Sequence, residues 1–328
     1  MRNPFSSQRL ALGTSIATLA LLCAAFDSQA ETRVTFKSAA AGTAYYLMGR
    51  DLADAIREGS DDAIMLTLEE SQGSIQNVME VSAREGNYVF TSPAVLIEQA
   101  MAGEGAFAEH PHPRFQEIRG LFPLPSMTMH FVLAGDKGSL DFSVLEGKHI
   151  LIGRGTFGAR EATRYLALFG LEGRVKIANA AIHSGPDAIK NEQIDGFVTA
   201  SAYPSPSVLE AASYQPISLI SLTDEQIEQT GATHQTIPGG TYPGINNDVH
   251  TTSHPVIAYT TTAMDEETAY TLTKTFWEHH ENLAEDAPWW SSVSPEMLID
   301  MADTLHPGAR RYYQQAGNEI PDALRSIF

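Results

Sequence analysis

The 328-residue sequence has a single cysteine, Cys23, which lies in an apolar stretch near the N-terminus. The chain beyond residue 30 has no cysteine. Disulfides, thiolate nucleophiles and cysteine-ligated zinc or iron–sulfur sites are therefore excluded there. This composition fits an oxidising compartment outside the cytoplasm.

The first thirty residues have the pattern of a secretory signal. Met1–Ala30 opens with two arginines and no acid, continues into the apolar run "LALGTSIATLALLCAAF" and closes with "SQA" before Glu31. This order of basic, apolar and small residues is typical of a cleaved signal peptide. The run is shorter than the roughly 20 apolar residues that a membrane span needs. We therefore expect export, with a retained anchor as the alternative.

Basic residues are scarce. The sequence has 21 Lys and Arg against 40 Asp and Glu, a formal charge of −19. The first thirty residues carry a net charge of +1, so residues 31–328 carry −20. Such a chain repels phosphate backbones, and nucleic acid is not an expected partner. An anionic ligand would need local, oriented hydrogen-bond donors.

Common catalytic motifs are missing. The sequence lacks a Gly-x-Ser-x-Gly elbow, a His-Glu-x-x-His pair and a Gly-Lys-Ser/Thr phosphate loop, so we expect no enzyme and no cofactor. "GRGTFG", Gly153–Gly158, does fit the dinucleotide pattern, which leaves an exported oxidoreductase as the alternative. Against it, the next predicted strand ends in Asn179, where an acidic residue should bind the ribose.

No metal site is expected. His110 and His112 in "HPHPR" are spaced to grip a metal, but their proline-rich surroundings favour a surface loop. His279 and His280 come late in a predicted helix, where a favourable contact with the helix dipole explains them equally well.

Strand-like and helix-like segments alternate along the chain. Strands are predicted over 32–39, 62–71, 88–93, 129–135, 148–153, 175–179, 195–202 and 254–263. Helices are predicted over 46–57, 74–86, 94–101, 159–170, 185–194, 204–213, 265–283, 294–305 and beyond 307. This alternation predicts an α/β fold of two lobes, each a mixed sheet flanked by helices.

Five strand-to-helix turns share one composition: "GTAYY", "ESQGS", "FTSPA", "GRGTFGAR" and "TASAYPSP". All consist mainly of Gly, Ser, Thr and Ala, with Tyr or Phe nearby in most of them. Ligands in open α/β sheets gather at the carboxyl ends of strands, where helix N-termini present unpaired N–H groups. Any one turn could be plain helix capping. Together they predict one shared pocket for a small anion.

Several of these segments also carry a resemblance. "GTAYYLMGRDLADAI", "ESQGSIQNVMEV", "YVFTSPAVLIEQAMAG", "IPGGTYPGINNDVHTTSHPVIAYTT" and "LHPGARRYY" follow one another in the order found in the TAXI group of TRAP-transporter solute receptors. The resemblance covers essentially all of the chain beyond residue 30.

The resemblance implies a periplasmic binding protein of the type II-like, two-lobe class. Such a receptor closes on a small organic acid or amino acid and delivers it to integral-membrane TRAP permease subunits. Lobe 1 would comprise 31–131 plus 253–328 and lobe 2 would comprise 132–252, with hinge strands near 128–134 and 250–260. A receptor that serves a membrane sensor is the alternative.

The resemblance also implies ligand-binding residues. Lobe 1 would contribute Gly42, Thr43, Ala44, Tyr45, Ser71, Gly73, Ser74, Thr91 and Ser92. Lobe 2 would contribute Thr156, Phe157, Gly158, Thr199, Ala200 and Ser201, with Tyr242 as a closing wall or hinge residue.

Two positions depart from the family pattern. Gly155-Thr156-Phe157-Gly158 stands where the family has Gly-Ser-Gly-Thr, and Ser201 replaces a glycine. Glutamate, the best-known ligand type, is therefore not carried over. Arg160, one turn into the next helix, could grip a carboxylate; the alternative is a solvated helix arginine.

Overall fold

The computed structural model describes residues 31–138 and 140–316. The predicted signal Met1–Ala30, including Cys23, lies outside the described residues. The strands are β1 (Thr32–Lys37), β2 (Ile64–Glu69), β3 (Tyr88–Pro93), β4 (Ile118–Ala134), β5 (His149–Leu151), β6 (Lys176–Ala178), β7 (Gly196–Ser201), β8 (Ile217–Leu219), β9 (Thr233–Ile237) and β10 (Val249–Thr261). The helices are α1 (Ala44–Gly59), α2 (Ser74–Glu80), α3 (Ala94–Ala102), α4 (Phe157–Leu168), α5 (Gly185–Lys190), α6 (Pro206–Tyr214), α7 (Asp224–Thr230), α8 (Glu266–Asp286) and α9 (Pro307–Ala316).

Within the described residues the strands form one mixed sheet. Its order is β2-β1-β3-β10-β4-β7-β5-β6, with β8 paired to β4 and β9 paired to β10. Strand β1 is parallel to β2 and β3, and β5 is parallel to β6 and β7, whereas every pair that includes β4 or β10 is antiparallel. The predicted α/β class with mixed sheets is confirmed.

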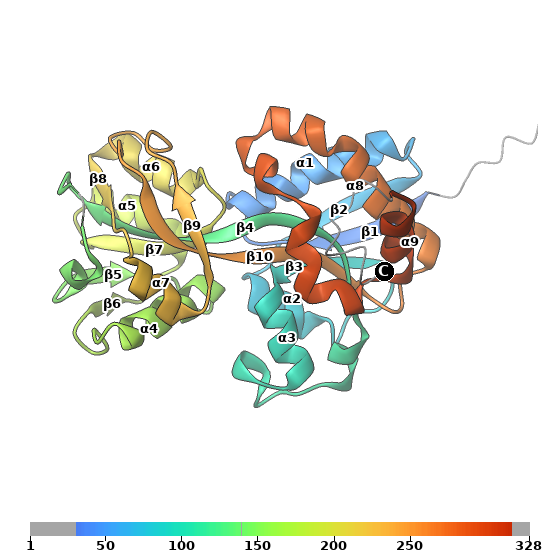
Figure 1. The fold of residues 1–328 in the computed structure, drawn as a ribbon, viewed down its shortest axis with the longest axis horizontal. Helices are drawn as coiled ribbons and strands as arrows, with labels where there is room; N and C mark the ends of the chain where they lie inside the picture. The colour runs from blue at the N-terminus through green and yellow to red at the C-terminus, as the bar shows by residue number, and fades with distance from the viewer. Residues whose placement is uncertain (1–30, 139, 317–328) are drawn as a thin grey trace, which may run out of the picture. The chain divides into compact units, whose positions relative to one another are not determined.

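Strands β4 and β10 connect two halves of the sheet (Figure 1). They have 17 and 13 residues, against at most 6 in any other strand, so each is long enough to pair on both sides. The first half contains β1–β3 with α1–α3, α8 and α9. The second half contains β5–β9 with α4–α7.

Each half has its own hydrophobic packing. One large cluster fills the first half, and two smaller clusters cover the two faces of the second half. The division follows from strand geometry: Phe131 and Val132 are neighbours on β4, and successive side chains point to opposite faces. Phe131 joins one cluster and Val132 the other.

Helix α1 shows how sequence periodicity fixes the first half. Met48, Leu52, Ala55 and Ile56 are buried, as the i, i+4, i+7, i+8 spacing predicts. The helix begins at Ala44, two residues earlier than predicted. Its first turn therefore includes Tyr45.

Some elements differ from the prediction. Strand β4 begins at Ile118, eleven residues before the predicted start at 129. The prediction missed this part because it contains Pro123 and Pro125, which disfavour a central strand. They are tolerated where the pairing with β10 is irregular. The predicted helix 294–305 is wrong: Pro295–Thr304 forms a 3₁₀ helix. Helix α2 ends at Glu80 rather than near 86, and β8, α7 and β9 were not predicted.

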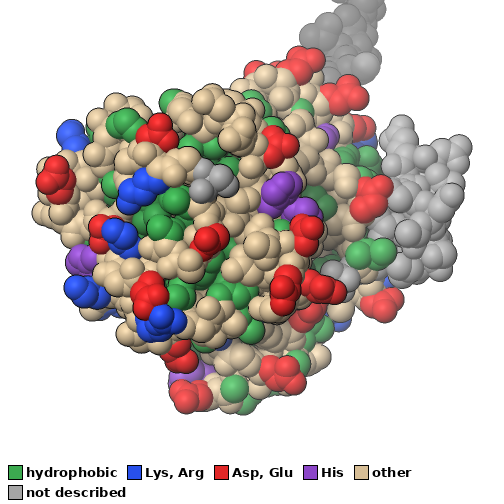
Figure 2. Space-filling model, turned by 60° about the vertical axis from the view of Figure 1, so that its left-hand side comes forward, with side chains coloured by type: hydrophobic (Ala, Val, Ile, Leu, Met, Phe, Trp, Pro, Cys, Tyr) green, Lys and Arg blue, Asp and Glu red, His purple; other side chains and the backbone are tan. Residues whose placement is uncertain are grey.

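Basic and acidic side chains are distributed differently over the surface in Figure 2. On the face in Figure 2, Lys and Arg side chains gather towards one side, whereas Asp and Glu side chains occur across the whole face. Among the described residues, no helix combines the length and apolar character needed to cross a membrane.

Candidate functional site

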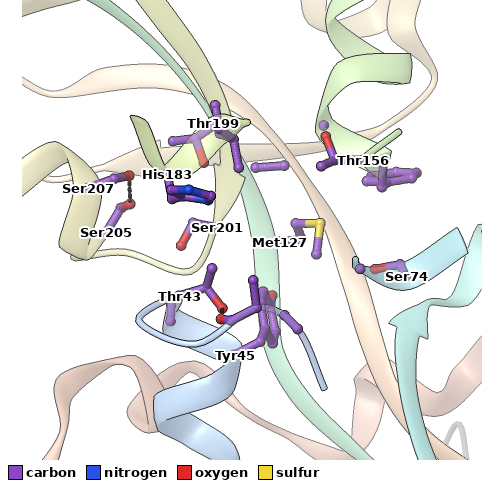
Figure 3. A pocket seen from close by; sticks show the side chains of 18 of the residues that line it. Thr43, Tyr45, Ser74, Met127, Thr156, His183, Thr199, Ser201, Ser205 and Ser207 are labelled. Carbon is purple, nitrogen blue, oxygen red and sulfur yellow. Dashed lines mark hydrogen bonds between the residues drawn. The ribbon is translucent and has the colours of Figure 1, made fainter. Parts of the chain in front are cut away.

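A cavity of about 190 Å³ lies where strand ends of both halves meet the first turns of several helices (Figure 3). The strands are β1, β3 and β7, and the helices are α1, α2, α4 and α6. Thirteen of the seventeen predicted ligand-binding residues line it: Gly42, Thr43, Ala44, Tyr45, Gly73, Ser74, Thr91, Thr156, Phe157, Gly158, Thr199, Ala200 and Ser201. Ser71, Ser92, Arg160 and Tyr242 do not.

The start of α1 presents uncapped amides. Thr43 occupies the N-cap position, but its side chain makes no capping bond and donates instead to the Ala40 carbonyl at 2.7 Å. The first-turn N–H groups of a helix have no acceptor within the helix. Tyr45 closes this wall: its hydroxyl donates to the Pro125 carbonyl at 2.7 Å, and burial raises its pKa well above the usual value.

Ser71 supports the next turn from behind the cavity wall. Its hydroxyl donates to the Ser38 carbonyl at 2.9 Å and accepts from the Gly73 N–H at 3.0 Å. Gly73 precedes α2 with φ of +120°, a conformation that favours glycine, and makes no side-chain cap. The start of α2 is therefore also uncapped.

Ser92 lies in a layer beneath the cavity. It is fully buried, and its hydroxyl contacts the Ser74 carbonyl at 3.0 Å and the Tyr259 hydroxyl at 3.1 Å. Asn77 joins the same layer, donating to the Ser38 and Thr91 carbonyls at 2.7 and 2.8 Å. These bonds fix the ends of β1 and β3, so Ser92 holds the wall in place.

The start of α4 is built differently. The Thr156 hydroxyl accepts from the Ala159 N–H at 3.0 Å and so caps its own helix. Gly158 packs directly on β7, where a Cβ would lie 2.9 Å from the Ala200 Cβ. Phe157, between them, is 4% exposed. This turn thus provides a packed wall.

The start of α6 is held by a buried hydrogen-bond chain. The Ser205 N–H donates to the Tyr242 hydroxyl oxygen at 2.7 Å, and that hydroxyl donates to His130 Nε2 at 2.8 Å. His130 Nδ1 in turn donates to the Thr128 carbonyl at 3.0 Å. Burial lowers the pKa of His130 to about 4, so the ring is neutral at pH 7. Tyr242 therefore supports the cavity wall from outside it.

The cavity contains little side-chain charge. Among the described residues that line it there is no lysine or arginine, and the ionisable side chains are Tyr45, His183 and Glu210. The Glu210 carboxylate accepts a hydrogen bond from the Tyr214 hydroxyl at 2.9 Å. Arg160 is exposed and lines a second cavity on the other side of Phe157. An anion in the first cavity would be solvated mainly by backbone N–H groups and hydroxyls.

Thirteen further described lining residues were not among the predicted ligand-binding residues, and they include Met127, His183, Ser205, Ser207 and Glu210. Ser205 and Ser207 lie in or next to the "TASAYPSP" turn, and their small polar character was a usable signal. His183 lies in the 3₁₀ turn Ile182–Ser184 directly before α5, and Met127 belongs to the part of β4 that was not predicted. Only the fold brings these residues to the cavity.

The histidines that suggested a metal grip have structural partners. His112 Nδ1 accepts from the Arg114 N–H at 3.2 Å, and His280 Nε2 lies 2.9 Å from the Trp290 carbonyl. Across residues 31–138 and 140–316, no group of three or more His, Cys, Asp or Glu side chains is arranged to hold a metal ion.

The chain belongs to the NMT1-like family, whose model matches residues 36–317. Its structure is similar to that of the periplasmic binding protein BugD, with a TM-score of 0.54, 13% identity, and coverage of 89% of this chain and 99% of that chain. It also matches a TRAP periplasmic solute-binding protein from Ochrobacterium anthropi with bound L-fuconate, with a TM-score of 0.44, 12% identity, and coverage of 91% and 98%. The fold is that of two-lobe periplasmic binding proteins.

Proposed function

We propose that this member of the NMT1-like family is an extracytoplasmic solute receptor of the TAXI type. It binds a small organic acid or amino acid through a carboxylate and delivers it to a TRAP-type membrane permease. The family match and the fold shared with BugD support the receptor class. The TAXI assignment rests on the ordered sequence motifs.

The observation that carries this proposal is the group of helix starts around one cavity. Helices α1 and α2 begin there without a side-chain cap, so their first-turn N–H groups are available to a ligand. Helix α6 also lacks a side-chain cap, but it begins with Pro206, which has no N–H, and its Val208 N–H bonds the Ser205 carbonyl. The partial positive charge at helix N-termini favours an anion. These N–H groups are local, oriented hydrogen-bond donors, which an anionic ligand needs in order to bind a chain with a large net negative charge.

Ligand binding would be coupled to lobe closure. We assign residues 31–131 and 253–328 to lobe 1 and residues 132–252 to lobe 2, with β4 and β10 as the hinge. The lining residues come from both sides of this division, for example Thr43 and Ser74 from one and Thr199 and Ser201 from the other. A ligand that touches both lobes binds the closed state more tightly and so selects it.

The receptor performs no chemistry and needs no cofactor. It would act in the periplasm after removal of its signal. For a small acid we expect a dissociation constant in the low micromolar range, about 8 kcal/mol of binding free energy.

The proposal is tested by identifying the small molecule that co-purifies with the protein. The chain is purified from cells, extracted and examined by mass spectrometry, and the molecules found are added back in isothermal titration calorimetry. A small carboxylate that binds with 1:1 stoichiometry and raises the melting temperature supports the proposal. A bound nucleotide, or chemical conversion of the bound molecule, would contradict it and favour the oxidoreductase alternative.

The permease partner needs its own test. Proteoliposomes that contain a TRAP permease should take up the labelled ligand only when the loaded receptor and a sodium gradient are both present. A ligand that binds tightly but is never transported would favour the sensor alternative.

A further inference from the structure

The ligand cavity has a neighbour. A second cavity, of about 920 Å³, lies between α3 on the lobe 1 side and α4 on the lobe 2 side, with Ser253–Pro255 of β10 between them. Two described residues line both cavities, Thr156 and Phe157. Thr156 and Phe157 therefore lie in the partition between the two spaces.

Phe157 supplies the bulk of this partition. The hydroxyl of Thr156 is fixed in the α4 cap, whereas the Phe157 ring fills the space between the cavities and is 4% exposed. The ring packs edge-on against the His254 ring of β10, with centroids 4.8 Å apart and planes at 85°. It belongs to the hydrophobic cluster of the first half although its helix belongs to the second. A ligand that extended past it would have to displace a buried ring.

The second cavity has a cation available on its wall. Arg164 is paired with Glu161 and donates to the Thr230 carbonyl. Arg160 is exposed and lines the same cavity, and its side chain has no hydrogen bond or ion pair with residues 31–138 or 140–316, whereas its backbone N–H donates to the Thr156 carbonyl at the start of the helix. It lies three positions after Phe157, on the same side of α4.

We propose that Phe157 is the residue that sets the maximum length of the ligand, and that the second cavity is a latent subsite in which Arg160 receives the anionic end of a longer one. The inference rests on the proposed function. It explains what the phenylalanine adds at a turn that otherwise consists of small residues: a closed end to the ligand cavity.

The experiment compares the wild-type chain with Phe157→Ala and Phe157→Leu in calorimetric titrations. The probes are linear α,ω-dicarboxylates of four to ten carbons. Wild type and Phe157→Leu should bind the short members and reject the long ones. Phe157→Ala should bind the eight- to ten-carbon members at least tenfold more tightly than wild type. An unchanged length limit in Phe157→Ala would overturn the proposal.

The role of Arg160 is tested in the Phe157→Ala background. Arg160→Gln should weaken binding of the eight-carbon dicarboxylate at least tenfold. Arg154→Gln is the matched control, because Arg154 is exposed on the preceding turn, contacts Asn179 and lines neither cavity. If the two substitutions have equal effects, Arg160 does not bind the ligand in the second cavity.

A crystal structure of ligand-free Phe157→Ala separates this inference from the proposed function. If neither the wild type nor the variant binds any dicarboxylate, the proposed carboxylate-binding function fails. The crystal structure of the variant still shows whether Phe157 separates the two cavities. One continuous cavity from Thr43 to Arg160 supports the proposal. Collapse of the surrounding residues into the vacated space, which keeps the cavities apart, overturns it.

Discussion

Thr43 and Thr156 occupy equivalent positions, each immediately before a helix whose first turn lines the ligand cavity, yet their hydroxyls behave differently. Thr156 caps α4, whereas Thr43 turns back to the Ala40 carbonyl and leaves α1 uncapped. A third helix start, that of α6, is held from outside the cavity by Tyr242. A threonine before a helix can therefore either stabilise the helix or leave its first-turn N–H groups open to a ligand, depending on which donor or acceptor the loop brings near its hydroxyl.

The largest effect should follow from blocking the open helix start. Thr43→Trp places a large ring at the mouth of α1 and should raise the dissociation constant from micromolar to beyond millimolar, about 4 kcal/mol. Thr43 is half-buried, so the melting temperature should change little. Calorimetry with the co-purified ligand measures the first quantity and thermal unfolding the second.

Thr67→Trp is the control, because Thr67 is exposed on β2 in the same half of the molecule and does not line the cavity. Equal ligand affinity of the two tryptophan variants would show that the start of α1 is not part of the ligand site.

The buried chain behind α6 should show a pH dependence. Burial depresses the pKa of His130 from 6.5 to about 4, so the neutral ring stabilises the fold fully above about pH 6.5, and this contribution is lost as the pH falls towards 4. The loss amounts to about 3 kcal/mol. The His130→Gln side chain can still accept a hydrogen bond from Tyr242 but does not titrate. Between pH 7 and 4 the unfolding free energy of this variant should therefore fall by about 3 kcal/mol less than that of the wild type. Urea unfolding at both pH values measures it, and parallel losses would contradict the assignment.

Removing the Tyr242 hydroxyl should loosen the α6 start. Tyr242→Phe deprives the Ser205 N–H of its acceptor and His130 of its donor, two buried hydrogen bonds worth about 2 kcal/mol of unfolding free energy together. Ligand affinity should fall about tenfold, a loss of about 1.4 kcal/mol, because Ser205 lines the cavity.

Tyr203→Phe provides the matched comparison for Tyr242. Tyr203 is half-buried, and its hydroxyl accepts one hydrogen bond, from Gln235 at 3.0 Å. Its loss should cost less than about 1 kcal/mol. If Tyr203→Phe is as damaging as Tyr242→Phe, the buried chain has no special role.

The smallest expected effect is a difference in stability between alanine variants of Thr156 and Thr43. Thr156→Ala removes a helix cap and should lower the unfolding free energy by about 1 kcal/mol. Thr43→Ala removes a hydrogen bond that caps nothing, and we expect a change below about 0.5 kcal/mol. Chemical denaturation of both variants checks this order, and an equal loss would show that the two helix starts do not differ energetically.

The alternating elements could be predicted because they depend on local patterns, and the small-residue turns together with the family resemblance gave 13 of the 26 described residues that line the cavity. The buried stripe of α1 could be read from Met48 to Ile56, and the small-residue turns marked where strands end and helices begin. Only the last six of the 17 residues of strand β4 were predicted, because Pro123 and Pro125 disfavour a strand and the pairing with β10 that stabilises it is not visible in the sequence. Its hidden part delivers Met127 to the cavity and the Pro125 carbonyl to Tyr45.

The composition of the site could be read from the sequence: its turns are rich in small and hydroxyl-bearing residues, and the only basic residues in them are the arginines that flank Thr156–Gly158. Residue types and periodicity are local, and a local pattern suffices to place a helix start after a strand. Only the tertiary structure decided which helix starts stay open, that Ser92 and Tyr242 stand behind the wall, and that Phe157 separates two cavities. Those outcomes depend on contacts between residues far apart in the chain, such as Tyr242 with His130 and Phe157 with His254, and no local pattern encodes them.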